Sequence, residues 1–298
     1  MDKEILDLIY HEKLLPENHS EIVSLKLLKE GMTNSNYLCI TEAGSKYVIR
    51  IPGYNTSEMI DRKSEWANHH KITVLNLNTK HVAYLKNSWI KVSVYVENTL
   101  ETITSRYKAI DIACKALKRL HNSDIVFANR FWVSDMIGRY ENIVRRNKVQ
   151  LSPLYLLLRA TLKSNSDDFL YSKIKWTACH NDLVKGNILL DSSKNIYLID
   201  WEYSGMNDPL WDLASFILEN ELTPSEEHYM LEKYHQDENL RPESQSIIAL
   251  FKIYQDILWY LWAKIKEYYG SQYGDYSEKR IRRALKNYAN FNCEIFMP

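Results

Sequence analysis

The sequence predicts an α+β protein of two unequal lobes, a small one of antiparallel strands with one helix and a larger, mainly helical one. Segments in which apolar and polar residues alternate, as in strands, are concentrated before residue 97. Beyond that position, helical periodicity dominates to the end of the chain. A chain of 298 residues is also long enough to build two cores. We therefore expect lobes at residues 1–97 and 98–298.

The smaller lobe is expected to begin with a short helix and a turn, up to about residue 19. Strands are then expected at residues 21–28, 37–40, 46–53, 80–85 and 89–96, with a helix at 57–72. The turn-forming stretch 30–36 predicts a hairpin whose backbone N–H groups can face nucleotide phosphates, together with Thr33, Asn34 and Ser35. An ordinary surface turn is the alternative, because no G-x-G-x-x-G pattern is present.

Two charged residues of this lobe form a candidate pair. Arg50 lies on an expected strand, where its forked and permanently charged side chain can contact phosphate oxygens. Glu65 lies near the centre of the expected helix and can pair with Arg50, as the strand–helix ion pair does in kinases. A solvated strand residue and an exposed helix glutamate are the alternatives.

A hinge at residues 98–102 is expected to lead into the larger lobe. Its helices are expected at residues 104–122, 134–148, 153–161, 210–218, from 223 onward, 243–269 and 277–292, with a polar loop at 163–168. The helix that follows Thr223 has proline at its first position and Glu226 at its third, so we expect a capping box there.

A motif between the third and fourth of these helices carries the chemistry. His180, Asp182 and Asn187 form the pattern H-x-D-x-x-x-x-N, and an apolar strand then ends at Asp200. Two strands joined by the polar residues 192–195 would form a hairpin that returns Asp200 to Asn187. This is the arrangement of the catalytic loop and metal-binding aspartate in kinase-fold phosphotransferases.

The residue types suit phosphoryl transfer. That reaction needs a carboxylate near the attacking hydroxyl and hard oxygen ligands for Mg²⁺. We expect Asp182 to be the catalytic base and Asn187 and Asp200 to be the metal ligands, while His180 braces the loop. A loop with an ordinary histidine and aspartate, followed by an unrelated strand, is the alternative.

Composition narrows the class of protein. Lys plus Arg and Asp plus Glu number 38 each, so net charge favours neither nucleic acid nor a membrane surface as a partner. The four cysteines lack metal-ligand spacing, which favours free thiols in a reducing compartment. The N-terminus lacks a signal peptide's apolar region, and charged and polar residues interrupt the longest apolar stretch, 247–262. We therefore expect a soluble, cytoplasmic protein.

Taken together, these motifs resemble the choline/ethanolamine kinase family. The resemblance rests on the H-x-D-x-x-x-x-N stretch and on residues 199–203 and 207–214, extends to 31–34 as a nucleotide loop, and covers nearly the whole chain. It implies a protein-kinase-like fold, shared with aminoglycoside phosphotransferases, with ATP and Mg²⁺ as cofactors and adenine at residues 95–98. Within the family, the chain is most similar to bacterial choline kinases that supply phosphocholine for cell-surface polymers. Lys185 departs from relatives, which often carry an acidic residue nearby.

The resemblance also implies a choline pocket. Trp259 and Trp262 lie three residues apart on an expected helix, so their rings share one side of it. Aromatic faces suit a trimethylammonium group, which has no N–H to donate. The family positions add Tyr203, Glu219 and Tyr276 to the pocket. From spacing alone, a pair of core tryptophans is the alternative.

Other functions stay open at this point. A kinase for ethanolamine, thiamine or an aminoglycoside would use the same catalytic residues, and a pseudokinase would bind ligands without turnover. The basic run Lys279–Arg283 argues against a polycationic sugar as the substrate. The presence of Asp182, Asn187 and Asp200 argues against a pseudokinase.

Overall fold

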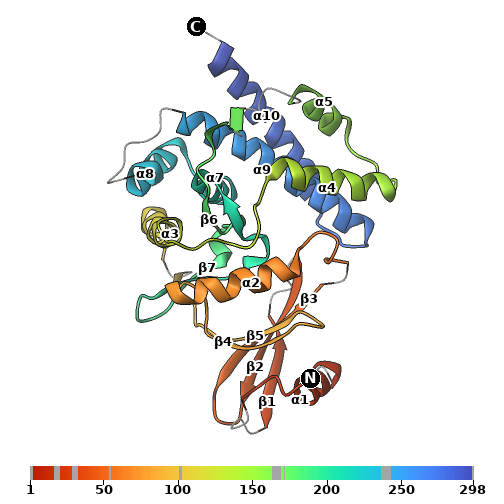
Figure 1. The fold of residues 1–298 in the computed structure, drawn as a ribbon, viewed down its shortest axis with the longest axis vertical. Helices are drawn as coiled ribbons and strands as arrows, with labels where there is room; N and C mark the ends of the chain where they lie inside the picture. The colour runs from red at the N-terminus through yellow and green to blue at the C-terminus, as the bar shows by residue number, and fades with distance from the viewer. Residues whose placement is uncertain are drawn as a thin grey trace.

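The computed structural model describes residues 3–16, 21–28, 33–53, 55–100, 103–162, 169–170, 172–235 and 243–296. Three expected features lie wholly or partly outside these ranges: residues 31–32 of the nucleotide loop, residues 101–102 of the hinge and the polar loop 163–168. Within the described ranges, a small sheet lobe and a larger helical lobe lie one above the other (Figure 1).

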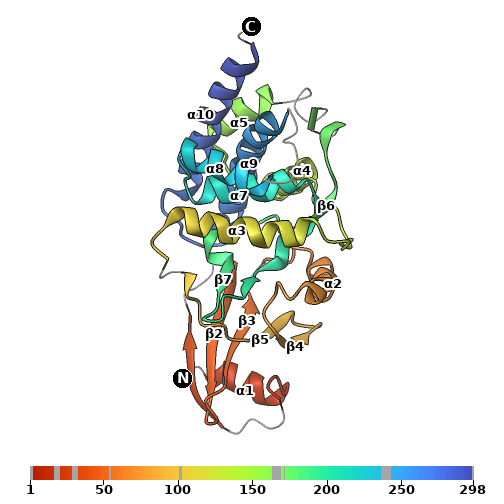
Figure 2. The ribbon, with the colours of Figure 1, turned by 90° about the vertical axis from the view of Figure 1, so that its left-hand side faces the viewer.

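A five-stranded antiparallel sheet forms the smaller lobe, with the strand order β1-β2-β3-β5-β4. Its elements are α1 (Lys3–His11), β1 (Ile22–Leu27), β2 (Asn34–Thr41), β3 (Lys46–Pro52), α2 (Arg62–Ile72), the 3₁₀ turn η1 (Thr73–Leu75), β4 (His81–Leu85) and β5 (Ile90–Val94). Helix α1 packs beside the sheet at the end far from the helical lobe, whereas α2 lies where the lobes meet (Figures 1 and 2).

The two faces of β3 have different neighbours. Tyr47 and Ile49 are buried in the small core that Ile9 of α1 completes. Because side chains alternate along a strand, Arg50 points to the opposite face of the sheet. There it lies across from Lys91 of β5 in the strand register. Arg50 therefore lies on the face of the sheet that is turned toward α2 and the larger lobe.

Helix α2 begins at Arg62 rather than at Ser57, so the expected start was wrong. The Asp61 carboxylate accepts hydrogen bonds from the backbone N–H groups of Lys63 and Ser64, at 3.1 and 3.2 Å, and thereby caps the helix. The preceding residues form a connection between β3 and α2 at the boundary of the lobes.

The larger lobe is mainly helical, so the expected α+β class is confirmed. Its elements are α3 (Arg106–His121), α4 (Val133–Arg146), α5 (Pro153–Thr161), β6 (Thr177–Cys179), η3 (Lys185–Asn187), β7 (Ile188–Leu190), β8 (Ile196–Leu198), η4 (Trp201–Tyr203), β9 (Gly205–Asn207), α7 (Pro209–Glu219), α8 (Pro224–Tyr234), α9 (Ser244–Tyr268) and α10 (Tyr276–Phe296). Helix α9 is buried along most of its length, between α4, α7 and α10. Its apolar sequence is therefore that of a core helix.

Local sequence signals account for several of these elements. The capping box expected at Thr223 is present, since its hydroxyl accepts from the Glu226 N–H while the Glu226 carboxylate accepts from the Thr223 N–H. The expected hairpin after Asn187 is also present as β7 and β8. The pair of short strands β6 and β9 was not expected, because three-residue strands leave too little alternation to detect.

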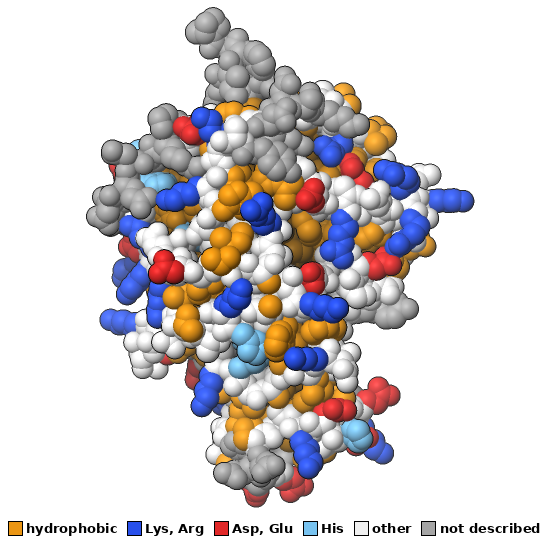
Figure 3. All heavy atoms as spheres, in the orientation of Figure 1, with side chains coloured by type: hydrophobic (Ala, Val, Ile, Leu, Met, Phe, Trp, Pro, Cys, Tyr) orange, Lys and Arg blue, Asp and Glu red, His pale blue; other side chains and the backbone are white. Residues whose placement is uncertain are grey.

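The described surface and helices bear on two expectations from composition. Basic and acidic side chains are interspersed on the face shown in Figure 3, in keeping with their equal numbers. None of the described helices combines the length and apolar character that a membrane crossing requires. Cys39, Cys114 and Cys179 are buried free thiols.

The segment after β5 docks on the β7–β8 hairpin. The Asn98 side-chain oxygen accepts hydrogen bonds from the N–H groups of Leu100 and Leu190, and Thr99 donates its N–H to the Leu190 carbonyl at 2.7 Å. Met59 and Ile72, which precede this segment, pack in the core of the larger lobe. Residues before 97 thus contribute to the core of the larger lobe, and the expected boundary between residues 97 and 98 stays a prediction.

Candidate active site

The β7–β8 hairpin brings the two expected metal ligands together. Ile188 pairs with Leu198, and the Ile199 N–H donates to the Asn187 carbonyl at 2.9 Å, so Asp200 follows directly beside Asn187. The Asn187 side-chain nitrogen donates to the Asp182 carbonyl at 2.8 Å. This bond uses the amide N–H₂ group and leaves the amide oxygen as the atom suited to a metal.

Asp212 fixes the backbone of the catalytic loop. It is fully buried, and its two carboxylate oxygens accept from the N–H groups of His180 and Asn181 at 2.8 and 2.7 Å. His121 adds a third contact at 2.9 Å. Asp212 lies in the first turn of the buried helix α7. Because its carboxylate accepts three hydrogen bonds, it holds the catalytic loop against this helix.

Asn181 adopts a left-handed backbone conformation, with φ at 67°. Asparagine tolerates this region better than most residues, and here its side chain is also tied down. Its nitrogen donates to the Tyr203 carbonyl at 3.0 Å and its oxygen accepts from Asn207 at 2.9 Å. The next residue, Asp182, is thereby directed away from the core.

His180 braces the loop, as expected. Its Nε2 donates to the Ile199 carbonyl at 2.8 Å, and its Nδ1 accepts from the Asp182 N–H at 3.3 Å. Burial lowers the pKa of His180, which keeps the ring neutral with its proton on Nε2. The ring therefore links the strand before Asp200 to the catalytic loop.

The pKa of the Asp182 carboxyl is shifted upward in this site. Burial raises the pKa of its carboxyl well above the usual range, and the nearby carboxylates of Asp200, Glu202 and Glu219 raise it further. No described side chain donates a hydrogen bond to this carboxylate. A group with this environment can accept a proton from a substrate hydroxyl.

Five buried side chains from both lobes form what we call the interlobe ion cluster: Asn34, Arg50, Arg62, Glu65 and Glu202. Arg50 lies 2.6 Å from Glu65, which is the pair expected from the sequence. Arg62 lies 2.8 Å from Glu65 and 3.1 Å from Glu202, which belongs to η4 in the larger lobe. The cluster therefore joins β3 and α2 to the segment that follows Asp200.

Arg50 connects this cluster to the metal-ligand side of the site. Its Nη1 lies 3.4 Å from the Asp200 carboxylate. Its Nε and Nη2 atoms are buried and lack a hydrogen-bond partner among the described residues. Unsatisfied guanidinium donors have the chemistry that phosphate oxygens require.

Among the three polar residues expected to bind nucleotide, the structure gives Asn34 another role. Its amide nitrogen donates to Glu202 at 2.9 Å, and its oxygen accepts from Arg62 at 3.1 Å. These bonds tie the Asn34 side chain to the interlobe ion cluster, and its contact with nucleotide stays a prediction. Thr33 and Ser35 are partly exposed, and their contact with nucleotide stays a prediction.

Gly53 permits a close backbone approach at the same place. Its N–H donates to the Thr33 carbonyl at 3.0 Å. A Cβ atom at residue 53 would lie 2.3 Å from that carbonyl oxygen. Only glycine therefore allows the end of β3 to hold the start of β2.

The expected aromatic residues are largely buried and contact one another in two groups. Tyr203 and Trp259 meet edge to face, with ring centres 5.0 Å apart, and Trp262 stacks on Tyr273 at 5.4 Å. Burial raises the pKa of Tyr276 to about 12, and Glu219 and Asp182 add to that rise. Because Asp182 raises the pKa of both Tyr203 and Tyr276, its carboxylate lies near these two rings. Tyr273 was missed, because it lies in a short connection without helical spacing.

The Glu219 carboxylate is paired with an arginine. Arg280 of α10 binds both of its carboxylate oxygens and also contacts Asp256 at 3.1 Å. The basic run 279–283 was expected to be a basic tail, but Arg280 points inward and is 6% exposed. Sequence reasoning missed Arg280 and Asp256, although both lie one helical turn from expected pocket residues.

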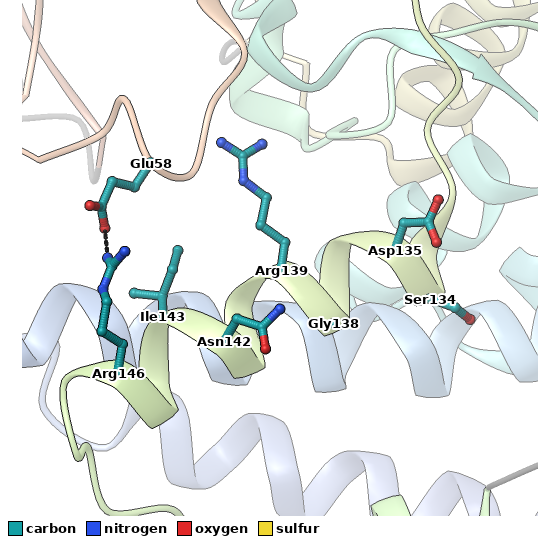
Figure 4. Close-up of a pocket in the computed structure, with 8 residues that line it drawn as sticks. All are labelled: Glu58, Ser134, Asp135, Gly138, Arg139, Asn142, Ile143 and Arg146. Carbon is teal, nitrogen blue, oxygen red and sulfur yellow. Dashed lines mark hydrogen bonds and ion pairs between the residues drawn. The ribbon is translucent and has the colours of Figure 1, made fainter.

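A separate cavity of about 670 Å³ lies between α4 and the connection that precedes α2 (Figure 4). Glu58 and Arg146 meet across one side of it at 2.6 Å. None of the expected site residues is among those that line it, which are Glu58, Ser134, Asp135, Gly138, Arg139, Asn142, Ile143 and Arg146.

Mg²⁺ fits the donor set at the hairpin. Asp200 offers a partly exposed carboxylate, and Asn187 offers a neutral amide oxygen. Hard oxygen donors of this kind suit Mg²⁺, which also keeps water and phosphate ligands. The carboxylates of Asp182 and Glu202 add negative charge around the position.

Comparisons with known proteins bear on the family and the fold of this chain. The family model described as choline/ethanolamine kinase matches residues 25–254. Protein LicA of Haemophilus influenzae is 33% identical over 270 residues, which cover 86% of this chain and 77% of that protein.

Solved structures match over nearly the full chain. The choline kinase LicA from Streptococcus pneumoniae matches with a TM-score of 0.84 at 32% identity, covering 97% of this chain and 99% of that one. A structure of LicA in complex with AMP gives a TM-score of 0.81 at 32% identity, with coverage of 97% and 98%. These matches confirm the expected kinase-like two-lobed fold.

The charge around Asp182 predicts a gain in stability when it is neutralised. A carboxyl whose pKa is raised by folding favours the unfolded state at higher pH, where its charge is penalised only in the folded protein. Asp182→Asn should therefore increase the free energy of unfolding of the ligand-free protein at pH 8. The gain should shrink as the pH falls, because wild-type Asp182 then becomes protonated when folded.

Chemical denaturation across this pH range measures the effect. Asp124→Asn, a change at an exposed carboxylate, is the matched control and should leave stability nearly unchanged. A loss of stability in Asp182→Asn at pH 8 would contradict the electrostatic account.

The contact between Gly53 and Thr33 predicts a second effect. Gly53→Ala should displace the start of β2 and weaken Mg·ATP binding roughly tenfold, since small displacements of positioning groups are costly. Titration calorimetry with a non-hydrolysable ATP analogue measures this. Gly138→Ala is the control, because a Cβ there meets no atom within 4 Å. Equal affinities in both variants would show that the close approach is unimportant.

Proposed function

Because the chain belongs to the choline/ethanolamine kinase family, we propose that it transfers the γ-phosphate of ATP to the hydroxyl of choline, giving phosphocholine and ADP. The observation that carries this proposal is the position of Tyr203, which packs edge to face on Trp259, lies in the 3₁₀ turn that directly follows Asp200 and accepts a hydrogen bond from Asn181, the neighbour of Asp182. One part of the site thus suits a methylated cation, and the adjoining part suits phosphoryl transfer.

We assign the base role to Asp182. The choline oxygen forms a bond to the γ-phosphorus while the bond to the ADP oxygen breaks, and Asp182 accepts the hydroxyl proton. Its raised pKa makes proton transfer to it more favourable than to an ordinary aspartate. The backbone of Asp182 is held in place because its N–H donates to His180 Nδ1 and its carbonyl accepts from the Asn187 side chain.

The remaining residues position the phosphates. Mg²⁺, held by Asn187 and Asp200, would neutralise the charge of the triphosphate. Arg50, whose Nη1 is held by Glu65 and lies 3.4 Å from Asp200, would contact phosphate oxygens. Thr33 and Ser35 would cover the phosphates from β2, and the adenine would lie near residues 95–98.

Choline is favoured over the other small alcohols by two observations. The pocket residues Tyr203, Trp259, Trp262 and Tyr276 present rings, which attract a trimethylammonium group without hydrogen bonds. The well-covered solved structure with 32% identity is itself described as a choline kinase. A cytoplasmic location fits the need for ATP, and we expect no nucleic acid or membrane among the partners.

The base role predicts a large loss of turnover. Asp182→Asn should lower kcat for choline by about 10²- to 10⁴-fold, the usual contribution of general base catalysis. The KM for ATP should change little, because Asp182 is not among the proposed ATP contacts. Coupled ADP-release kinetics measures both constants, with Asp124→Asn as the control. Near-normal turnover in Asp182→Asn would rule out the base role.

The substrate assignment predicts a clear order of specificity. Choline should give the highest kcat/KM when choline, ethanolamine, thiamine and kanamycin are compared at saturating Mg·ATP. The reason is that choline alone joins a trimethylammonium group to a short primary alcohol. A higher kcat/KM for any of the other three compounds would contradict the assignment of choline as the substrate.

A further inference from the structure

We infer that Arg280 sets the preference of the pocket for a quaternary amine, because it holds the Glu219 carboxylate away from the substrate. This inference rests on the proposed function, since it concerns the selectivity of the same site. Arg280 touches neither the transferred phosphate nor a metal ligand, so it is a positioning residue that acts through Glu219.

Arg280 binds the Glu219 carboxylate at both oxygens, and we call this contact the clamp. Nη1 and Nη2 of Arg280 bind the two oxygens of Glu219, the second at 2.7 Å. Nη2 also donates to the Tyr276 hydroxyl at 2.6 Å, and the guanidinium carbon lies 4.7 Å from the centre of the Tyr276 ring. Because Tyr276 and Arg280 are four residues apart on α10, both side chains lie on one face of the helix.

The carboxylates of Glu219 and Asp256 are matched in number by the guanidinium groups of Arg280 and Arg283. Asp256, which lies three residues before Trp259 on α9, is bound by Arg283 at 2.8 and 2.7 Å as well as by Arg280. Two carboxylates, the buried Asp256 and the partly buried Glu219, therefore meet two guanidinium groups. Arg283 approaches Glu219 only to 3.7 Å, so Arg280 is its main partner.

A neutralised Glu219 affects the two amines differently. The ammonium group of ethanolamine carries three N–H donors, and each one loses water on entering the pocket and needs an acceptor. The trimethylammonium group of choline has no such donor and gains its stabilisation from the rings. With Glu219 occupied by Arg280, the pocket rejects the primary amine and accepts the quaternary one.

Arg280→Met removes the clamp and keeps an unbranched side chain in its place. Asp256 keeps both hydrogen bonds from Arg283, whereas Glu219 loses its main partner and keeps only the 3.7 Å approach of Arg283. The ratio of kcat/KM for choline to that for ethanolamine should then fall by about tenfold or more, because the primary amine gains a charged acceptor. The matched control, Arg283→Met, removes the same charge from the same helix and should change this ratio by less than about twofold.

A second variant covers the case in which Arg280→Met does not fold, as judged by circular dichroism and thermal unfolding. Arg280→Lys keeps the buried charge and loses the two-pronged contact, so it should lower the ratio by a smaller factor. A folded Arg280→Lys with the wild-type ratio, or equal falls in Arg280→Met and Arg283→Met, would overturn the inference. Failure of the proposed function would instead appear in the wild-type protein, as the lack of choline-dependent ADP release.

Discussion

The interlobe ion cluster is the interaction on which the rest of the site depends. Arg50 and Glu65 come from the smaller lobe, and Glu202 follows Asp200 in the larger one. Burial raises the pKa of Glu65, but Arg50 and Arg62 outweigh it and hold that pKa near 2. Removing one partner of such a buried network typically costs about 3–5 kcal/mol, because the other charge is left unpaired. The cluster therefore fixes the lobes against each other at the point where phosphates would bind.

The catalytic loop depends on a second buried anion, Asp212, that is separate from this cluster. Its carboxylate accepts the N–H groups of His180 and Asn181, so the loop has its shape before any ligand arrives. Such preorganisation matters because phosphoryl transfer demands positioning more than covalent chemistry. By contrast, the Asp182 carboxyl accepts no hydrogen bond from a described side chain, and burial and nearby carboxylates disfavour its charged form. The stabilising hydrogen bonds are therefore made by Asp212 in the core, whereas the unfavourable electrostatic interactions fall on the Asp182 carboxyl.

The sequence predicted best those features that depend on residues close together in the chain. The hairpin between Asn187 and Asp200, the capping box at Thr223 and the helices of the larger lobe follow from local patterns, and all are present. The start of α2 was misplaced because a capping aspartate, Asp61, is difficult to tell from any other surface aspartate. Partners from distant segments left no such signal. The bond of Asn34 to Glu202 spans 168 residues, and the clamp of Arg280 on Glu219 spans 61.

The central claim is that one short region joins a metal-bound triphosphate to a ring-lined cation pocket. A crystal structure with Mg²⁺, a non-hydrolysable ATP analogue and choline tests this most directly. The account predicts the metal on Asn187 and Asp200, the choline hydroxyl within hydrogen-bond distance of Asp182, and its methyl groups against Trp259. Choline bound elsewhere, for example in the cavity beside α4, or a metal held away from Asp200, would contradict it.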